Sequence, residues 1–84
     1  MPHKIKIFTL STCSHCKAAK KLLTDCDVHY DFTDIDLLSG DARKAALDEV
    51  AQYNPGRTFP TLLIDDRVIV GFNEKKIREA LGLS

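Results

Sequence analysis

Hydrophobic and polar residues follow strand-like or helix-like spacing along nearly the whole chain. Four short runs that alternate, or stay apolar, predict strands at residues 5–10, 28–36, 61–64 and 67–70. Apolar residues that recur every three or four positions predict helices at residues 14–25, 41–53 and 74–82. The predicted order is therefore strand, helix, strand, helix, strand, strand, helix.

This order limits how the strands can be arranged. Two strands joined by a helix are expected to be parallel with a right-handed crossover, whereas the last two, joined by Asp65 and Asp66, form an antiparallel hairpin. The second strand has one polar face, which predicts a place at the edge of the sheet. We therefore expect one α/β domain over residues 1–84, with a mixed four-stranded sheet and helices on both of its faces.

Composition excludes several classes of partner. The chain of 84 residues has twelve basic and twelve acidic residues, so no basic field favours nucleic acid or an anionic membrane. No apolar run approaches the roughly 20 residues of a membrane span, and the first residues do not resemble a signal peptide. We expect a cytoplasmic monomer without nucleic-acid or membrane partners. Three cysteines fit poorly with a secreted disulfide framework, so a close pair is expected to be catalytic or metal-binding.

The close pair lies in Cys13-Ser14-His15-Cys16, where the first strand gives way to the first helix. Unpaired backbone N–H groups and the helix dipole would stabilise a thiolate at Cys13 and lower its pKa. Cys16, one turn further on, can attack a mixed disulfide at Cys13, and His15 is predicted to tune the Cys13 pKa. Cys26 falls on the apolar stripe of the helix and is predicted to be a small buried hydrophobic residue. The pattern predicts a redox-active site.

The same two thiols allow a second interpretation. Thr12-Cys13-Ser14-His15-Cys16 also resembles the loop of small heavy-metal-binding domains, in which two thiolates bind soft ions such as Cu(I). Those domains end in a strand and lack a proline motif, whereas this chain is predicted to end in a helix. A structural zinc site needs four ligands, and too few cluster here. We therefore predict no metal site, and soft-metal binding stays as the alternative function.

Two further motifs lie far from the cysteines. Thr58-Phe59-Pro60 precedes the third predicted strand, and Gly71 precedes the last helix. With the Cys-x-x-Cys motif after the first strand, the chain resembles the glutaredoxin branch of the thioredoxin superfamily. The resemblance implies a three-layer thioredoxin-like fold of order βαβαββα. It also implies a dithiol thiol–disulfide oxidoreductase that reduces protein or small-molecule disulfides with no cofactor beyond its redox-active disulfide.

The resemblance assigns roles to individual residues. Cys13 would be the attacking thiol and Cys16 the resolving thiol. Pro60 would be a cis-proline that faces the cysteines, and Phe59 would offer backbone hydrogen bonds to an extended thiol substrate. Residues that would bind substrate or glutathione are Arg57, Thr58, Phe59, Pro60, Gly71, Phe72 and Asn73. Among these, Arg57 would bind a carboxylate of glutathione.

Three stretches differ from the glutathione-using members. The chain has one glycine and no aspartate pair before the last helix, Ser14-His15 in place of Pro-Tyr, and no lysine shortly before the cysteines. Two electron donors are therefore expected as alternatives, glutathione and a flavin-dependent reductase.

Overall fold

The structure is a computed structural model that describes residues 3–83. All predicted helices and strands are present. They are β1 (Ile5–Thr9), α1 (Ser14–Asp25), β2 (Asp31–Asp34), the 3₁₀ helix η1 (Ile35–Leu37), α2 (Gly40–Tyr53), β3 (Thr61–Ile64), β4 (Arg67–Val70) and α3 (Glu74–Ala80). The predicted helix at residues 14–25 has the observed bounds of α1, and the last two strands are also as predicted.

The second strand is shorter than predicted. Pairing with β1 covers only Asp31 to Asp34, and the chain then turns into η1. The prediction of a strand over residues 28–36 was wrong because β1 ends at Thr9 and offers no partner to the residue after Asp34. That residue, Ile35, lies at the start of η1 and is buried. Helix α2 begins at Gly40 with Ser39 as its N-cap residue, although the Ser39 side chain makes no cap hydrogen bond.

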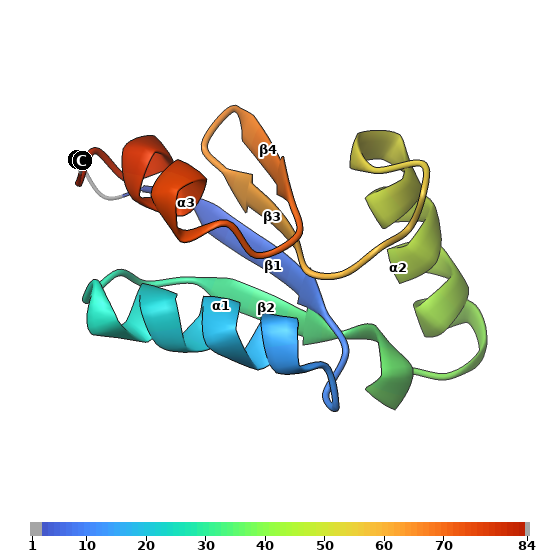
Figure 1. Cartoon of the computed structure of the whole chain (residues 1–84). Coiled ribbons are helices and arrows are strands. Elements are labelled where there is room, and N and C mark those ends of the chain that lie inside the picture. The colour runs from blue at the N-terminus through green and yellow to red at the C-terminus, as the bar shows by residue number, and fades with distance from the viewer. Residues whose placement is uncertain (1–2, 84) are drawn as a thin grey trace.

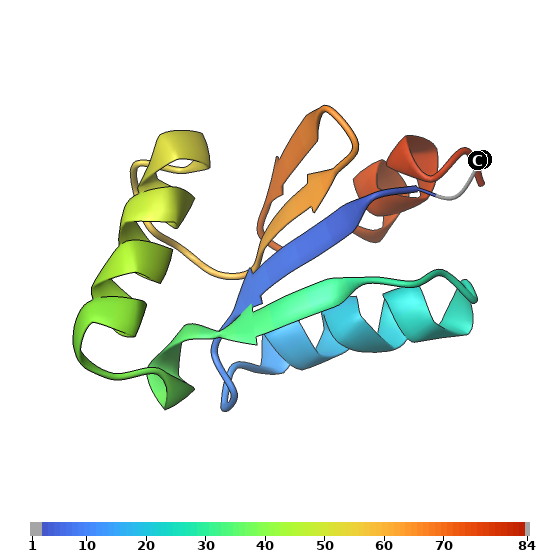
Figure 2. The same ribbon diagram turned by 180° about the vertical axis from the view of Figure 1, so that it is seen from behind.

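The four strands form one mixed sheet in the order β2-β1-β3-β4 (Figure 1). Strands β1 and β2 are parallel, whereas β1 with β3 and β3 with β4 are antiparallel. Strand β2 lies at an edge, as its polar face predicts. The crossover from β1 to β2 runs through α1, which runs alongside β2 and is partly hidden behind it in the reverse view (Figure 2).

Helices cover both faces of the sheet. Helices α1 and α3 share one face, where the core consists of Ile5, Ile7, Ala19, Leu22, Leu23, Leu62, Ile64, Ile69, Ile77 and Leu81. Helix α2 covers the other face, where Val50 packs with Phe8 and Ile35. The alternation of Ile7 and Phe8 between these faces follows from the period of two in a strand. Cys26 packs against the first cluster and is half-buried rather than fully buried.

Strand register brings several loops to one end of the sheet. Thr9 pairs with Asp34, Phe8 pairs with Thr61, and Thr61 pairs with Val70. The loop that leaves β1, the loop that enters β3 and the loop that leaves β4 therefore start beside one another. These three loops carry the motifs that are far apart in the sequence.

Candidate active site

Cys13 is the N-cap residue of α1. Its backbone is extended (φ −82°, ψ 122°), and its N–H donates to the carbonyl of Leu10 at 3.1 Å, which closes the turn after β1. This conformation turns the Cys13 Sγ toward the first helical turn, where it accepts the Cys16 N–H at 3.4 Å. Lys17 N–H donates to the Cys13 carbonyl at 3.0 Å and continues the helix. The sulfur thus takes the place of the side-chain oxygen in an ordinary N-cap.

These contacts favour the thiolate of Cys13. The Cys16 thiol and then the Cys16 N–H hydrogen-bond to the Cys13 sulfur and lower the pKa of the Cys13 thiol, with a further contribution from the His15 N–H, while partial burial opposes them. Hydrogen bonds to a charged form stabilise it. The contribution of His15 in this structure is that of its backbone N–H. Tuning by its exposed imidazole stays a prediction.

Cys16 has the opposite environment. Its side chain is 0% exposed, and burial raises the pKa of its thiol to about 11. The Leu10 N–H donates to the Cys16 Sγ at 3.5 Å and favours the thiolate. The pair therefore consists of a half-buried thiol that ionises readily and a buried thiol that holds its proton.

The loop before β3 is organised by Asn54, the C-cap residue of α2. Asn54 is buried, and its Nδ2 donates to the Thr58 carbonyl at 3.1 Å, the Thr58 hydroxyl at 2.9 Å and the Thr61 hydroxyl at 3.2 Å. Arg57 N–H donates back to the Asn54 carbonyl at 2.9 Å. The Phe59–Pro60 peptide bond in this loop is cis. Only the position of Asn54 directly after a helix, a few residues before Thr58 and Thr61, could have suggested this role.

The structure joins two of the predicted binding motifs directly. Gly71 N–H donates to the Pro60 carbonyl at 2.8 Å, so the end of β4 is fixed to the proline loop. Gly71 has φ +83°, a conformation that favours glycine. The next residue, Phe72, lines a hollow of about 240 Å³ with Ser14, His15 and Ala18. The loop after β4 therefore borders the first turn of α1.

For the other predicted binding residues, Arg57, Thr58 and Asn73, the described part of the chain shows no direct link to the cysteines. Arg57 is exposed and has φ +52°, and the Thr58 side chain is hydrogen-bonded to Asn54. Asn73 is the N-cap of α3, and its Oδ1 accepts the Lys76 N–H at 3.1 Å. None of the described hydrogen bonds joins these three side chains to the cysteines.

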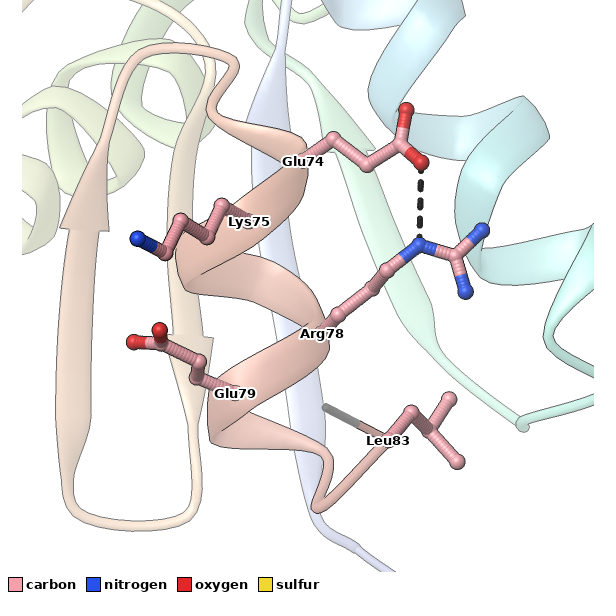
Figure 3. A pocket seen from close by; sticks show the side chains of 5 residues that line it. All are labelled: Glu74, Lys75, Arg78, Glu79 and Leu83. Atoms are coloured by element: carbon pink, nitrogen blue, oxygen red, sulfur yellow. Dashed lines mark hydrogen bonds and ion pairs between the residues drawn. The ribbon is translucent and has the colours of Figure 1, made fainter.

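A larger hollow lies elsewhere on the molecule. About 550 Å³ in volume, it is formed by the outer side of α3 and the following residue Leu83, with the Glu74–Arg78 ion pair at its side (Figure 3). Its lining residues include none of the predicted site residues. The larger of these two hollows is therefore not the one beside the cysteine motif.

Two further features concern residues 3–83. No group of three or more His, Cys, Asp or Glu side chains in this part of the chain is arranged to hold a metal ion. Within the same residues, every helix is too short or too polar to span a bilayer.

Comparison with known proteins identifies the family. The glutaredoxin family model matches residues 5–69, and the chain belongs to the glutaredoxin family. The mitochondrial glutaredoxin-2 of Pongo abelii is 33% identical over 67 residues, which cover 80% of this chain and 40% of that protein. The chain thus spans less than half the length of this curated relative.

Two solved structures of Methanosarcina proteins have a higher sequence identity to this chain. The methanoredoxin of Methanosarcina acetivorans is 48% identical, with 94% of this chain and 84% of that chain covered and a TM-score of 0.89. The glutaredoxin of Methanosarcina mazei Go1 is 49% identical, with 94% and 78% covered and a TM-score of 0.86. These matches confirm the thioredoxin-like fold and the family resemblance. They also separate the chain from heavy-metal-binding domains, because it has the second helix, the proline motif and the final helix that those domains lack.

Proposed function

We propose that the chain is a dithiol thiol–disulfide oxidoreductase that reduces protein or small-molecule disulfides through Cys13 and Cys16. The observation that carries this proposal is the contrast between two hydrogen-bonded thiols: hydrogen bonds lower the pKa of Cys13, and burial raises that of Cys16 to about 11. Only the thiolate is a good nucleophile. The order of attack follows from this contrast. Homologues in the glutaredoxin family are thiol–disulfide oxidoreductases, which supports the same conclusion.

The reaction has two exchange steps. Cys13 thiolate attacks one sulfur of the substrate disulfide, forms a mixed disulfide and expels the first substrate thiolate. Cys16 then loses its proton and attacks the Cys13 sulfur, which forms the Cys13–Cys16 disulfide and expels the second substrate thiolate. The proton of Cys16 ends on a substrate thiol, so the substrate gains two electrons and the protein loses two. No cofactor beyond the redox-active disulfide is needed.

The oxidised pair must be reduced again by an external donor. Glutathione is one candidate because the family suggests it, and Arg57, with Thr58 beside it, is the cationic residue in the loop that could receive a carboxylate. A flavin-dependent reductase is the other, because the chain lacks the aspartate pair before α3. The hollow beside Phe72 is small, so we place there only the part of a substrate next to its sulfur. We further propose a cytoplasmic monomer.

The test compares thiol variants and donors. Cys13→Ser should abolish disulfide reduction, because the attacking nucleophile is lost. Cys16→Ser should retain the first step and accumulate a mixed disulfide at Cys13, detectable by mass spectrometry. Oxidised wild-type protein is then incubated with glutathione alone, or with NADPH and a flavin-dependent thioredoxin reductase. Full activity of Cys13→Ser would overturn the proposal.

A further inference from the structure

One ion pair differs from the others in the described part of the chain. Lys20 Nζ lies 2.9 Å from Asp34 Oδ1, and the two side chains are 22% and 13% exposed. By comparison, the side chains of the Lys21–Asp25 pair on the same helix are 77% and 57% exposed. Lys20 Nζ also lies 4.2 Å from the centre of the Phe32 ring, a cation–π contact. Two independent contacts on β2 therefore fix the position of one ammonium group.

Asp34 is itself held from β1. The Thr9 hydroxyl, which is fully buried, donates to the Asp34 carboxylate and lies 3.2 Å from the Thr33 carbonyl. Burial favours the neutral form of Asp34, but the hydrogen bonds from Thr9 and Lys20 hold its pKa below the ordinary value. A largely buried carboxylate that loses its partner is strongly destabilised. Moving Lys20 away would leave the Asp34 carboxylate largely buried and without its charged partner. The free energy of this unpaired charge therefore keeps Lys20 in place.

Helix geometry places Lys20 on the same face of α1 as the resolving thiol. Lys20 follows Cys16 by four residues on α1, and side chains with this spacing are neighbours on one face of a helix. The Cys16 sulfur is also next to the same strand end, because it accepts the N–H of Leu10, which follows Thr9. The charge of Lys20 lowers the pKa of Cys16, against the dominant effect of burial. Two other titratable groups act here: Cys13, which raises the pKa of Cys16, and Asp36 in η1, whose charge raises the pKa of Asp34.

We propose that Lys20, held by Asp34 and Phe32, is a positioning residue that stabilises the Cys16 thiolate during the resolving step. The inference rests on the proposed exchange function but concerns only its second step. There the Cys16 S–H bond breaks, a Cys13–Cys16 disulfide forms, and the bond from Cys13 to the substrate sulfur breaks. The released substrate thiolate takes up the proton. The first step, attack by Cys13, does not use Lys20.

The expected size of the effect follows from thiol chemistry. Well below the pKa of Cys16, a rise of one pKa unit reduces the thiolate fraction about tenfold. The more basic thiolate is intrinsically about threefold more nucleophilic, given a Brønsted coefficient near 0.5. Resolution should therefore slow by about threefold for each unit by which the Cys16 pKa rises.

The test separates the two steps with an aromatic disulfide, dithiobis(nitrobenzoate). Each step releases one coloured thiolate, so stopped-flow absorbance gives the rate of Cys13 attack and then of Cys16 resolution. All proteins carry Cys26→Ala, which removes the third thiol. Lys20→Gln removes the charge but keeps an N–H donor for Asp34, Lys20→Arg keeps the charge, and Lys21→Gln is the matched control on the same helix. The Cys16 pKa is measured separately by thiolate absorbance in the Cys13→Ser background.

We expect Lys20→Gln to raise the Cys16 pKa and to slow only the second release, with Lys20→Arg and Lys21→Gln near wild type. If Lys20→Gln does not fold, Lys20→Gln/Asp34→Asn leaves no unpaired buried charge. A smaller rise of the Cys16 pKa is then expected, because the negative charge of Asp34 is removed together with the positive charge of Lys20. An unchanged Cys16 pKa, or an equal effect of Lys21→Gln, would overturn the proposal. If the proposed exchange function is wrong, no turnover will be seen with either electron donor. The Cys16 pKa can be measured without any exchange activity, so the two failures can be distinguished.

Discussion

Replacing Asn54 by alanine should loosen the loop that carries Pro60. The Asn54 amide has two N–H donors, which the structure shares among three acceptors on Thr58 and Thr61. A net contribution of about 1 kcal/mol for each donor gives about 2 kcal/mol for the side chain. For a domain of this size, each kcal/mol corresponds to roughly 4–8 °C in Tm. Asn54→Ala should therefore lower the free energy of unfolding by about 2 kcal/mol and Tm by about 10 °C.

Urea denaturation and thermal unfolding followed by circular dichroism measure this change. Gln52→Ala is the matched control, because Gln52 lies near the end of α2 but is exposed, and its effect should stay within about 0.5 kcal/mol. The Asn54→Ala variant should also affect substrate binding without changing the reactivity of Cys13. A looser Pro60 loop should raise KM for disulfide substrates and leave the alkylation rate of Cys13 unchanged. A loss below about 0.5 kcal/mol would refute the view that Asn54 organises this loop.

Two other predictions concern histidines. His15→Ala should raise the Cys13 pKa if the imidazole stabilises the thiolate, as the sequence predicts. The pH dependence of iodoacetamide alkylation measures this, and an unchanged Cys13 pKa would show that only the His15 backbone N–H, which persists in the variant, contributes. His3 Nδ1 lies 2.6 Å from Asp65, which raises the pKa of His3 and lowers that of Asp65. The stabilisation that His3 contributes is complete below its ordinary pKa of 6.5 and is lost as the pH rises through its raised pKa in the folded protein. The stabilisation that Asp65 contributes is complete above its ordinary pKa of 3.8 and is lost as the pH falls through its lowered pKa. His3→Gln should therefore cost most stability between these two values in urea titrations, and a pH-independent difference would contradict the pairing.

Much of this protein follows from local sequence patterns. Helix α1 was predicted with its observed bounds because its apolar stripe starts directly after a polar turn. The same pattern places Cys13 before the helix and Cys16 inside its first turn, and this difference of three residues already predicts which thiol ionises more readily. The hairpin of β3 and β4 is equally local, since two apolar runs flank a two-residue turn. The proline motif pointed to the family through resemblance.

Other features were decided only by contacts between distant residues. The length of β2 depends on where β1 ends, and its sequence continues to look strand-like beyond Asp34. The ion pair of Lys20 and Asp34 joins a helix to a strand across 14 residues, and Thr9 reaches Asp34 across 25. A lysine on the polar side of a helix looks like a solvated residue until the sheet places a largely buried carboxylate beside it. Burial and pairing are properties of the packed layers, and so the chemistry around Cys16 emerges only when those layers assemble.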